Sequence, residues 1–539
     1  MPTPSRLGKF DVPKVSFNEY LMNHLKNKLR ECPDKKAFIA AEDHHNSVTY
    51  KQLYEHVQSV ETYLDNIGFK KGDVALIAAP NSWQYIVILA AVACRGGALS
   101  GANPDYTSFE LKRQILDCKA NVVFCGEETL KRVQNATKDL NNIKLIVISN
   151  AHAHGVTTIS DVLKTKPRRL AQPRINPETD LVLIPYSSGT TGDPKGVMLS
   201  HRNMVAMLEA IETYYDQQLM KDLEIDMGKE TICLLMPMFH AYGCCVSLNT
   251  LIRGTTIVLL KKFDFELFCK TIQDFKVRVQ FLVPMIILLL VNHPLVKKYN
   301  LSSLEVIQSG AAPLGSDICE LAFQRYPNLR VLGQGYGMTE CTVGSHFLAV
   351  TKNNFSQVGL LAPNMELKIQ NPETGEEMPI GKEGEVCIKG PNVMVGYLNK
   401  PDATKKTIIN GWLHTGDIGY QDESGLLYIV DRLKELIKVN GFQVPPAQLE
   451  GILVSHPDIA DAAVIGIPDQ MAGELPKAFV VRKSDKLSVE DVKAFVAERT
   501  VHYKHLKGGV EFVKEIPRSP AGKILRKDLR LLEKKKAKL

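Results

Sequence analysis

The chain has 539 residues, of which 45% are hydrophobic and 23% are charged, and its formal net charge is +7. These values are typical of a globular protein with a large core. The positive residues are spread along the chain, which argues against nucleic-acid binding. The longest apolar runs, 85–94 and 281–291, are shorter than the span of about 20 residues that a transmembrane helix needs, so no membrane span is expected. Eleven cysteines without metal-ligand spacing predict buried free thiols in a reducing compartment, and neither disulfides nor zinc.

Apolar runs typical of strands alternate with helical patterns from about residue 50 onward. The strand-like runs cover 73–79, 121–126, 144–149, 180–186, 255–260 and 277–284. This alternation predicts an α/β fold of layered, largely parallel sheets. From about residue 354, short strands separated by glycines, among them 384–390 and 425–432, predict a smaller β-rich section.

A new α+β pattern begins after Asp431. Its expected strands are 435–441, 459–469, 476–483 and 509–517, and its expected helices are 445–456 and 488–500. This part is long enough to fold as a separate domain. We therefore predict a large N-terminal domain over 1–431, a hinge at 432–434 and a small mobile C-terminal domain over 435–539.

The stretch "SSGTTGDPKG", Ser187 to Gly196, is rich in glycine and hydroxyl residues but is not a Walker loop, because Pro194 precedes Lys195. Its glycines still allow consecutive N–H groups to surround an anion. It follows the expected strand 180–186, and Ser200 is placed to cap the next helix. The stretch can hold a triphosphate; the alternative is a loop without a ligand.

A second glycine cluster, "GQGYGMTE", runs from Gly333 to Glu340. Its glycines would let the backbone approach a flat ring beside Tyr336. Thr339 could bond an α-phosphate, and Glu340 could hold Mg²⁺ through oxygen. The alternative is an ordinary strand-to-helix turn. The small residues of 309–315 could likewise form a pocket wall or allow close backbone packing.

Two further segments contain charged residues that could belong to a binding or catalytic site. "WLHTGD" (412–417) is expected to place Asp417 on a tight turn, where it could accept both ribose hydroxyls, with Arg432 contacting sugar or phosphate. The alternative is a helix cap and a surface ion pair. "PRSPAGKILRKDLR" sets Lys523 on a turn framed by proline and glycine before a basic helix. That lysine could swing into a site, or it could be a solvated charge.

Taken in order, these motifs resemble the adenylate-forming (AMP-binding) superfamily, and within it the 4-coumarate:CoA ligases, beetle luciferases and related acyl-CoA synthetases. The segments that carry the resemblance are "YSSGTTGDPKGVMLSH", "MPMFHAYG", "SGAAPLG", "QGYGMTE", "GEVCIKG", "WLHTGD", "DRLKELIKVNGFQVPPAQLE" and "PRSPAGKILR", and they span nearly the whole chain. The resemblance implies that ATP and a carboxylic acid form an acyl-adenylate and pyrophosphate. The C-terminal domain then rotates, and the thiol of coenzyme A displaces AMP.

The resemblance also implies roles for individual residues. The implied ATP and AMP contacts are Ser187, Ser188, Gly189, Thr190, Thr191, Lys195, Gln334, Gly335, Tyr336, Thr339, Asp417, Arg432, Lys434, Lys438 and Lys523. The implied catalytic residues are Lys523, His240, Thr339 and Glu340, with Glu340 as the Mg²⁺ ligand. The implied acyl-pocket residues are His240, Tyr242 and Ala311, and the implied coenzyme A contacts are Lys262, Asn440 and Gly441. Lys434 matches the hinge. Plant ligases often carry Tyr-Lys-Gly where this chain has Val439, Asn440 and Gly441, so Asn440 departs from the pattern.

Physical reasoning agrees with the role of Lys523. Attack of a carboxylate on a phosphate brings negative charges together, so a cation is needed where the new charge develops. The same cation must leave to admit the thiol, which favours a lysine on a mobile domain.

The leading interpretation is an acyl-CoA ligase for a hydrophobic acid, aromatic or of medium to long chain. The alternatives are a luciferase-like monooxygenase that shares the adenylation step, a carrier-loading adenylation module and a non-enzymatic binding protein. The end of the chain, Ala537, Lys538 and Leu539, resembles a peroxisomal address read by an import receptor, with a random basic tail as the alternative. The sequence does not identify the acid.

Overall fold

The computed structural model describes residues 2–141, 143–149, 156–187, 194–311, 314, 316–350, 354–432, 437–444, 446–454, 456–517 and 526–536. They form two compact units. The large unit comprises Met1–Pro104, Gln114–Tyr186 and Gly196–Asp431, and the small unit comprises Asp105–Arg113, Ser187–Lys195 and Arg432–Leu539. Each unit has its own hydrophobic core.

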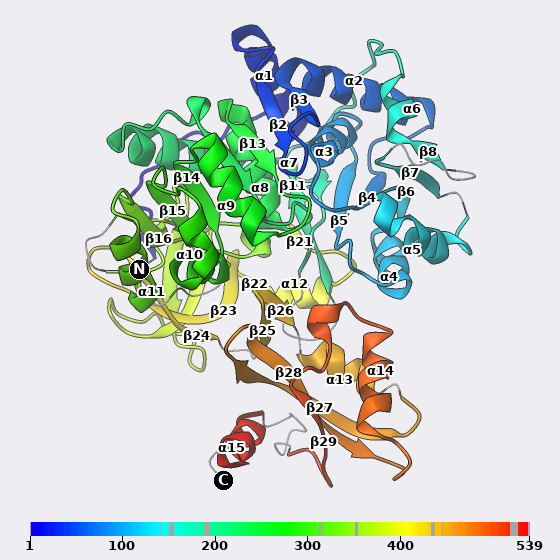
Figure 1. The fold of residues 1–539 in the computed structure, drawn as a ribbon, viewed down its shortest axis with the longest axis vertical. Helices are drawn as coiled ribbons and strands as arrows, with labels where there is room; N and C mark the ends of the chain where they lie inside the picture. The colour runs from blue at the N-terminus through cyan, green and yellow to red at the C-terminus, as the bar shows by residue number, and fades with distance from the viewer. Residues whose placement is uncertain are drawn as a thin grey trace. The chain divides into compact units, whose positions relative to one another are not determined.

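A mostly parallel sheet forms the first layer of the large unit (Figure 1). Its order is β11 (Lys195–Ser200), β9 (Leu181–Leu183), β5 (Ala98–Ala102), β4 (Val74–Ala78), β6 (Ala120–Cys125), β7 (Lys144–Val147) and β8 (Thr157–Thr158), with β10 (Tyr186–Ser187) and β21 (Gly396–Tyr397) paired to β11. The strands from β9 to β8 are parallel, and β11 pairs with β9 antiparallel. Four expected strands are thus confirmed as β4, β6, β7 and β9.

Three N-terminal helices pack together beside this sheet: α1 (Phe17–Glu31), α2 (Tyr50–Asn66) and α3 (Gln84–Cys94). Every residue of α3 from Tyr85 to Cys94 is buried, which confirms that this apolar run is a core element. Helix α2 begins with a capping box, in which Thr49 and Gln52 each accept the other's backbone N–H. The remaining helices of this part of the chain are α4 (Ser108–Cys118), α5 (Glu127–Thr137) and α6 (Ile159–Leu163).

Two smaller sheets form the next layer. One has the order β12 (Thr231–Leu234), β13 (Thr256–Leu259), β2 (Lys36–Ala40), β3 (Ser47–Thr49), and the other is the parallel set β14 (Val279–Leu282), β15 (Val306–Ser309), β16 (Val331–Gln334). Their helices are α7 (His201–Ile211), the π-helix η1 (Glu212–Met220), α8 (Ala241–Arg253), α9 (Phe265–Phe275), α10 (Pro284–Asn292) and α11 (Ser316–Arg325). Ser200 caps α7 as expected. The expected strand 277–284 is too long, because Pro284 begins α10, where proline suits the first helical turn.

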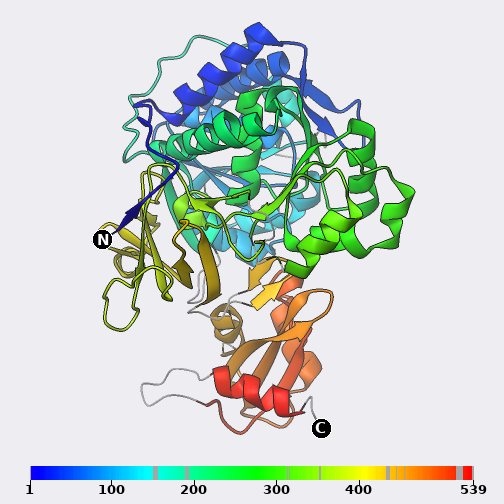
Figure 2. The same cartoon turned by 90° about the vertical axis from the view of Figure 1, so that its left-hand side faces the viewer.

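An antiparallel sheet forms the β-rich section, and the N-terminal strand joins its edge (Figure 2). Its order is β1 (Thr3–Pro4), β19 (Glu366–Gln370), β20 (Gly384–Lys389), β23 (Trp412–Gln421), β22 (Ile408–Ile409), and β24 (Leu427–Arg432) also pairs with β23. A separate two-stranded sheet consists of β17 (His346–Phe347) and β18 (Leu360–Leu361). The helix α12 (Pro401–Thr407) precedes β22. The expectation that Asp417 lies on a tight turn is wrong. It lies inside β23, where Gly416 at φ +74° and a register shift opposite Glu385 and Cys387 let the strand continue past the glycine.

The small unit is an α+β fold around the sheet β26 (Phe442–Val444), β25 (Ile437–Val439), β28 (Gly473–Arg482), β27 (Ile459–Asp469), with β29 (Gly509–Phe512) on β28. Its helices are α13 (Pro446–Val454), α14 (Val489–Ala497) and α15 (Arg526–Lys536). Helix α15 is fixed to the unit because the Arg526 guanidinium donates to both carboxylate oxygens of Glu450, at 2.8 and 2.6 Å.

All eleven cysteines are free, and all except Cys32 are buried, as predicted. In the described part of the chain, no helix combines the length and the apolar character that crossing a bilayer would require.

Candidate active site

A cavity in the large unit collects residues from α7, α8, the ends of β15 and β16, and the segment that follows β16. Six of the residues predicted from the sequence line it: His240, Tyr242, Ala311, Gly335, Tyr336 and Thr339. The predicted acyl residues and part of the predicted nucleotide residues therefore share one cavity.

His240 and Tyr242 stand where α8 begins. His240 is the N-cap of the helix, and its Nδ1 accepts the backbone N–H of Tyr242 at 3.4 Å. His240 lines the cavity and is exposed, but the surrounding protein desolvates its ring and lowers its pKa. The imidazole is therefore neutral near pH 7 and can orient a carboxylate without neutralising its charge.

Two glycines in the lining of the cavity allow close packing. A Cβ at Gly310 would lie 3.3 Å from the ring of Tyr242, and one at Gly337 would lie 2.1 Å from the carbonyl oxygen of Val343. Only glycine at position 337 permits this approach. The glycines of the "GQGYGMTE" cluster thus shape the cavity next to Tyr336.

Tyr336, which is half-buried, and Asp417, which is buried, form a polar pair. The Tyr336 hydroxyl donates to Asp417 Oδ2 at 2.7 Å, and Asp417 is only 4% exposed. Burial raises the pKa of Tyr336, and the Asp417 charge raises it further, so the phenol stays a donor across the physiological range. The aromatic ring provides a flat surface beside a carboxylate that can accept sugar hydroxyls.

Glu385 on β20 fixes the strand that carries Asp417. Its Oε1 accepts the backbone N–H of Gly416 at 3.1 Å, and its Oε2 lies 2.8 Å from His414 Nδ1. Cys387 Sγ lies 3.5 Å from the same nitrogen, so these three side chains could in principle ligate a metal. Burial raises the pKa of the Cys387 thiol to about 12, and Glu385 adds to this effect. We assign the group a structural role.

Thr339 and Glu340 lie on a short 3₁₀ turn, η4 (Thr339–Cys341), and both are buried. The Tyr397 hydroxyl donates to Glu340 Oε1 at 2.8 Å, which fixes the orientation of the carboxylate. Mg²⁺ typically takes one or two protein carboxylates together with substrate phosphates and water. The donor set of a single oriented carboxylate therefore fits this ion.

The comparisons with known proteins agree with this geometry. The model of the AMP-binding enzyme family matches residues 25–398, and that of the AMP-binding enzyme C-terminal domain matches residues 448–523. The chain belongs to the AMP-binding enzyme family.

Curated relatives of this AMP-binding enzyme resemble it over most of their length. 4-Coumarate–CoA ligase 1 of Petroselinum crispum is 40% identical over 493 residues, covering 89% of this chain and 88% of the relative. Acyl-CoA synthetase 7 of Caenorhabditis elegans is 38% identical over 542 residues, covering 99% of each chain.

Solved structures share the fold. An amide bond synthetase of Marinactinospora thermotolerans superposes with a TM-score of 0.82 at 26% identity, covering 96% of this chain and 99% of that one. A long-chain-fatty-acid–CoA ligase of Archaeoglobus fulgidus gives a TM-score of 0.77 at 26% identity, covering 94% and 98%.

Some predicted residues of the AMP-binding enzyme lie elsewhere in the described structure. Gln334 does not line the cavity; its amide accepts the Leu314 N–H at 2.7 Å and donates to the Phe355 carbonyl at 2.8 Å. Its side chain therefore supports the cavity wall. Lys262 is exposed just after β13.

Other predicted residues belong to the small unit. Ser187 ends β10 and Lys195 begins β11. The Lys438 backbone N–H donates to Glu474 at 2.8 Å. Asn440 and Gly441, at φ +50° and +81°, form the turn between β25 and β26.

Several predicted residues lie outside the described residues and stay predictions: Ser188, Gly189, Thr190, Thr191, Lys434 and Lys523, together with the terminal Ala537, Lys538 and Leu539. Arg432 is the last residue of β24, and only its backbone is described.

The structure adds cavity residues that motif reasoning missed, chiefly Asn249, Gln308 and Phe347. Asn249 follows Tyr242 by seven residues on α8, a spacing that returns to the same helix face. That spacing was the one available signal for this residue in the sequence.

Proposed function

We propose that this AMP-binding enzyme is an ATP-dependent acyl-CoA ligase, which activates a hydrophobic carboxylic acid as an acyl-adenylate and then transfers it to coenzyme A. The observation that carries the proposal is the shared cavity. Joining a carboxylate to an α-phosphate needs both groups in one place, and His240, Tyr242 and Ala311 line the same cavity as Gly335, Tyr336 and Thr339.

Each of these residues has a proposed role that follows from the chemistry of its side chain. His240 orients the carboxylate at the start of α8, and Thr339 lies close enough to the cavity to bond a phosphate oxygen. The Tyr336 ring and the Asp417 carboxylate hold the nucleoside, with Asp417 accepting hydroxyl hydrogens. Glu340 would hold Mg²⁺, which supplies positive charge to the phosphates when bound. Lys523 would supply the cation for adenylation and withdraw for thiolation.

The direct test is an assay of the purified full chain with a panel of aromatic and medium- to long-chain acids. Pyrophosphate release in the presence of ATP and an acid, followed by coenzyme A-dependent thioester formation, is the expected result. Pyrophosphate release without any thioester, whichever acid is supplied, would contradict ligation to coenzyme A.

The luciferase-like alternative predicts oxygen consumption and light in place of a thioester. The relatives reported above carry the names of a CoA ligase and an acyl-CoA synthetase, and these names favour ligation. Measuring light emission with luciferin, ATP and oxygen in the same preparation separates the two reactions.

Tyr397→Phe tests the proposed Mg²⁺ site. Loss of the phenol removes the hydrogen bond that orients Glu340, and removing such a supporting partner weakens metal binding by about 10- to 100-fold. We expect the Mg²⁺ concentration for half-maximal ATP binding, measured by calorimetry, to rise within that range. Tyr428→Phe, which removes a phenol bonded to Asp422, is the matched control and should leave this concentration unchanged.

We further propose that the chain is imported into peroxisomes through the terminal Ala537, Lys538 and Leu539. Deleting Leu539 should leave ligase activity intact, because an address of this kind is read by a receptor and takes no part in catalysis. A fluorescent protein fused to the N-terminus should change from a punctate peroxisomal pattern to a diffuse cytosolic one. A pattern that the deletion leaves punctate would show that the tail is not the address.

A further inference from the structure

One face of α8 forms the floor of the acyl cavity. Tyr242, Val246 and Asn249 all line the cavity, and their spacing of four and three residues puts them on the same side of the helix. A helix rises 1.5 Å per residue, so Asn249 lies about 10 Å further along the axis than Tyr242. His240, which orients the carboxylate, is at the opposite end of this face.

The far end of this face carries an amide with no partner among the described residues. Asn249 is 3% exposed, and its buried Nδ2 makes no hydrogen bond. Ile211, Val246 and Phe347 also line the cavity and offer no side-chain polar atom, whereas the buried Tyr215 hydroxyl and Gln308 Oε1 belong to residues of the same cavity and likewise make no hydrogen bond. Burying an amide without a hydrogen bond is costly, and most buried polar side chains in proteins have a partner. An apolar side chain at this position would avoid that cost.

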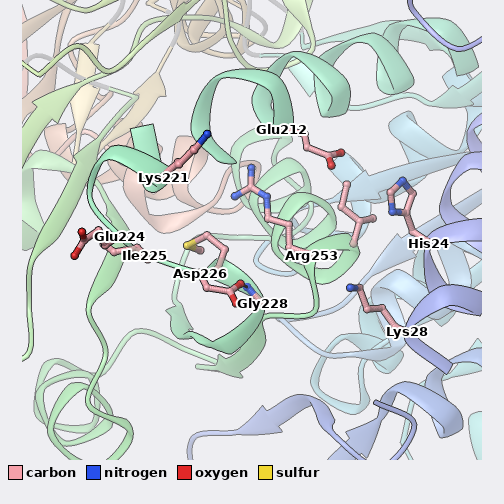
Figure 3. Close-up of a pocket in the computed structure, with 11 residues that line it drawn as sticks. His24, Lys28, Glu212, Lys221, Glu224, Ile225, Asp226, Gly228 and Arg253 are labelled. Atoms are coloured by element: carbon pink, nitrogen blue, oxygen red, sulfur yellow. Dashed lines mark hydrogen bonds between the residues drawn. The ribbon is translucent and has the colours of Figure 1, made fainter. Parts of the chain in front are cut away.

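The surroundings become charged one helical turn beyond Asn249. Ile252 and Arg253 of α8 line a second cavity, together with Glu212, which directly follows the acyl-cavity residue Ile211. Figure 3 shows Arg253 with the charged side chains of Lys221, in the segment after η1, and Lys28 of α1, and with the imidazole of His24. Charged groups therefore lie about one helical turn beyond Asn249, in a cavity separate from the acyl cavity.

We propose that the preferred acid carries a hydrogen-bonding oxygen or nitrogen about 13 Å from its carboxylate, because Asn249 follows His240 by nine residues, and that Asn249 is the specificity-determining residue that binds this group. The inference rests on the ligase function proposed above. A bound polar terminus would satisfy the Asn249 amide, whereas a plain alkyl chain would leave the amide buried and unpaired. A site built to bond a polar group rejects analogues that lack it more strongly than an apolar pocket rejects an extra hydroxyl.

The test compares unbranched medium-chain acids with ω-hydroxy acids of equal chain length, scored by kcat/KM for pyrophosphate release and for thioester formation. Wild-type protein should prefer the ω-hydroxy acid by about tenfold at the optimal length. Asn249→Leu, which keeps a similar volume and removes the amide, should reverse that preference. Val246→Ala on the same helix face is the matched control, and it should shift the preferred chain length without changing the sign of the preference.

Each outcome decides the inference. The inference is wrong if the wild-type enzyme uses the unbranched acids and the ω-hydroxy acids equally well. It is also wrong if Asn249→Leu slows the reaction of both series by the same factor while the variant unfolds at the wild-type temperature. If no acid of any class gives pyrophosphate release or a thioester, the ligase function fails, and the inference fails with it. Ligation of alkyl acids alone would refute the inference and leave the ligase function standing.

Discussion

Lys523→Ala is expected to slow acyl-adenylate formation by about 10²–10³, the usual effect of removing one electrostatic stabiliser. The reason is that attack of a carboxylate on a phosphate concentrates negative charge, and this lysine is the cation predicted to meet that charge. Thioester formation from a pre-made acyl-adenylate should stay close to the wild-type rate, because the lysine must leave before the thiol arrives. Both half-reactions are measurable on purified protein, the first by pyrophosphate exchange and the second by thioester appearance.

The matched control is Lys514→Ala, which removes an exposed lysine of the same unit. It should leave both half-reactions unchanged and so exclude a general effect of lost positive charge. Equal slowing of both half-reactions by Lys523→Ala would rule out the proposed division of labour between two conformations.

Local patterns were enough to predict many elements of this fold. A strand such as β4 or β27 is encoded by its own run of apolar residues, and Ser200 caps α7 through contacts within one turn of the chain. The Asn440–Gly441 turn is equally local, because Asn-Gly is a favoured pair where both residues of a hairpin turn need positive φ. This local demand gives a structural reason for asparagine at position 440, independent of coenzyme A.

The sequence alone could not predict which residues far apart in the chain form hydrogen bonds with each other. The Tyr397 hydroxyl reaches Glu340 across 57 residues, and Glu385 accepts the Gly416 N–H across 31. Neither pair leaves a periodic pattern in the sequence, because Glu340 on η4 and Tyr397 on β21, like Glu385 on β20 and Gly416 on β23, are brought together only by the folded chain. The same limit explains why Asp417 was expected on a tight turn: the glycine of "WLHTGD" indicates a bend, but only the pairing of β23 with β20 shows that the strand continues.

Gln334 shows a second kind of limit. Its place beside Gly335 fits the motif, but its amide is occupied by the Leu314 and Phe355 backbones. A motif assigns a residue to a neighbourhood, whereas the direction of its side chain depends on which backbone groups lie nearby. Asn249 is the converse case, since it belongs to no motif and yet lines the cavity.

Asp417→Ala is expected to weaken ATP binding by about 100-fold, because hydrogen bonds to a charged group contribute about 1.5–3 kcal/mol and each 1.4 kcal/mol is tenfold in affinity. The carboxylate is buried and already accepts the Tyr336 hydroxyl, so its position is fixed before the nucleotide arrives. The variant loses the acceptor for the ribose hydroxyls and leaves the Tyr336 hydroxyl without this partner. The KM for ATP should rise, while the KM for the acid should change little.

Tyr336→Phe separates the two effects of Asp417→Ala, which are the loss of the acceptor for the ribose hydroxyls and the loss of the hydrogen bond to Tyr336. It keeps the aromatic ring and the Asp417 carboxylate and removes only the hydroxyl that orients the carboxylate, so the KM for ATP should rise by no more than about tenfold. Thermal unfolding of both variants shows whether either substitution disturbs the fold. If Tyr336→Phe weakened ATP binding as much as Asp417→Ala, the hydroxyl would be the nucleotide contact and Asp417 its support, because a carboxylate that binds the ribose directly must matter more than the group that holds it in place.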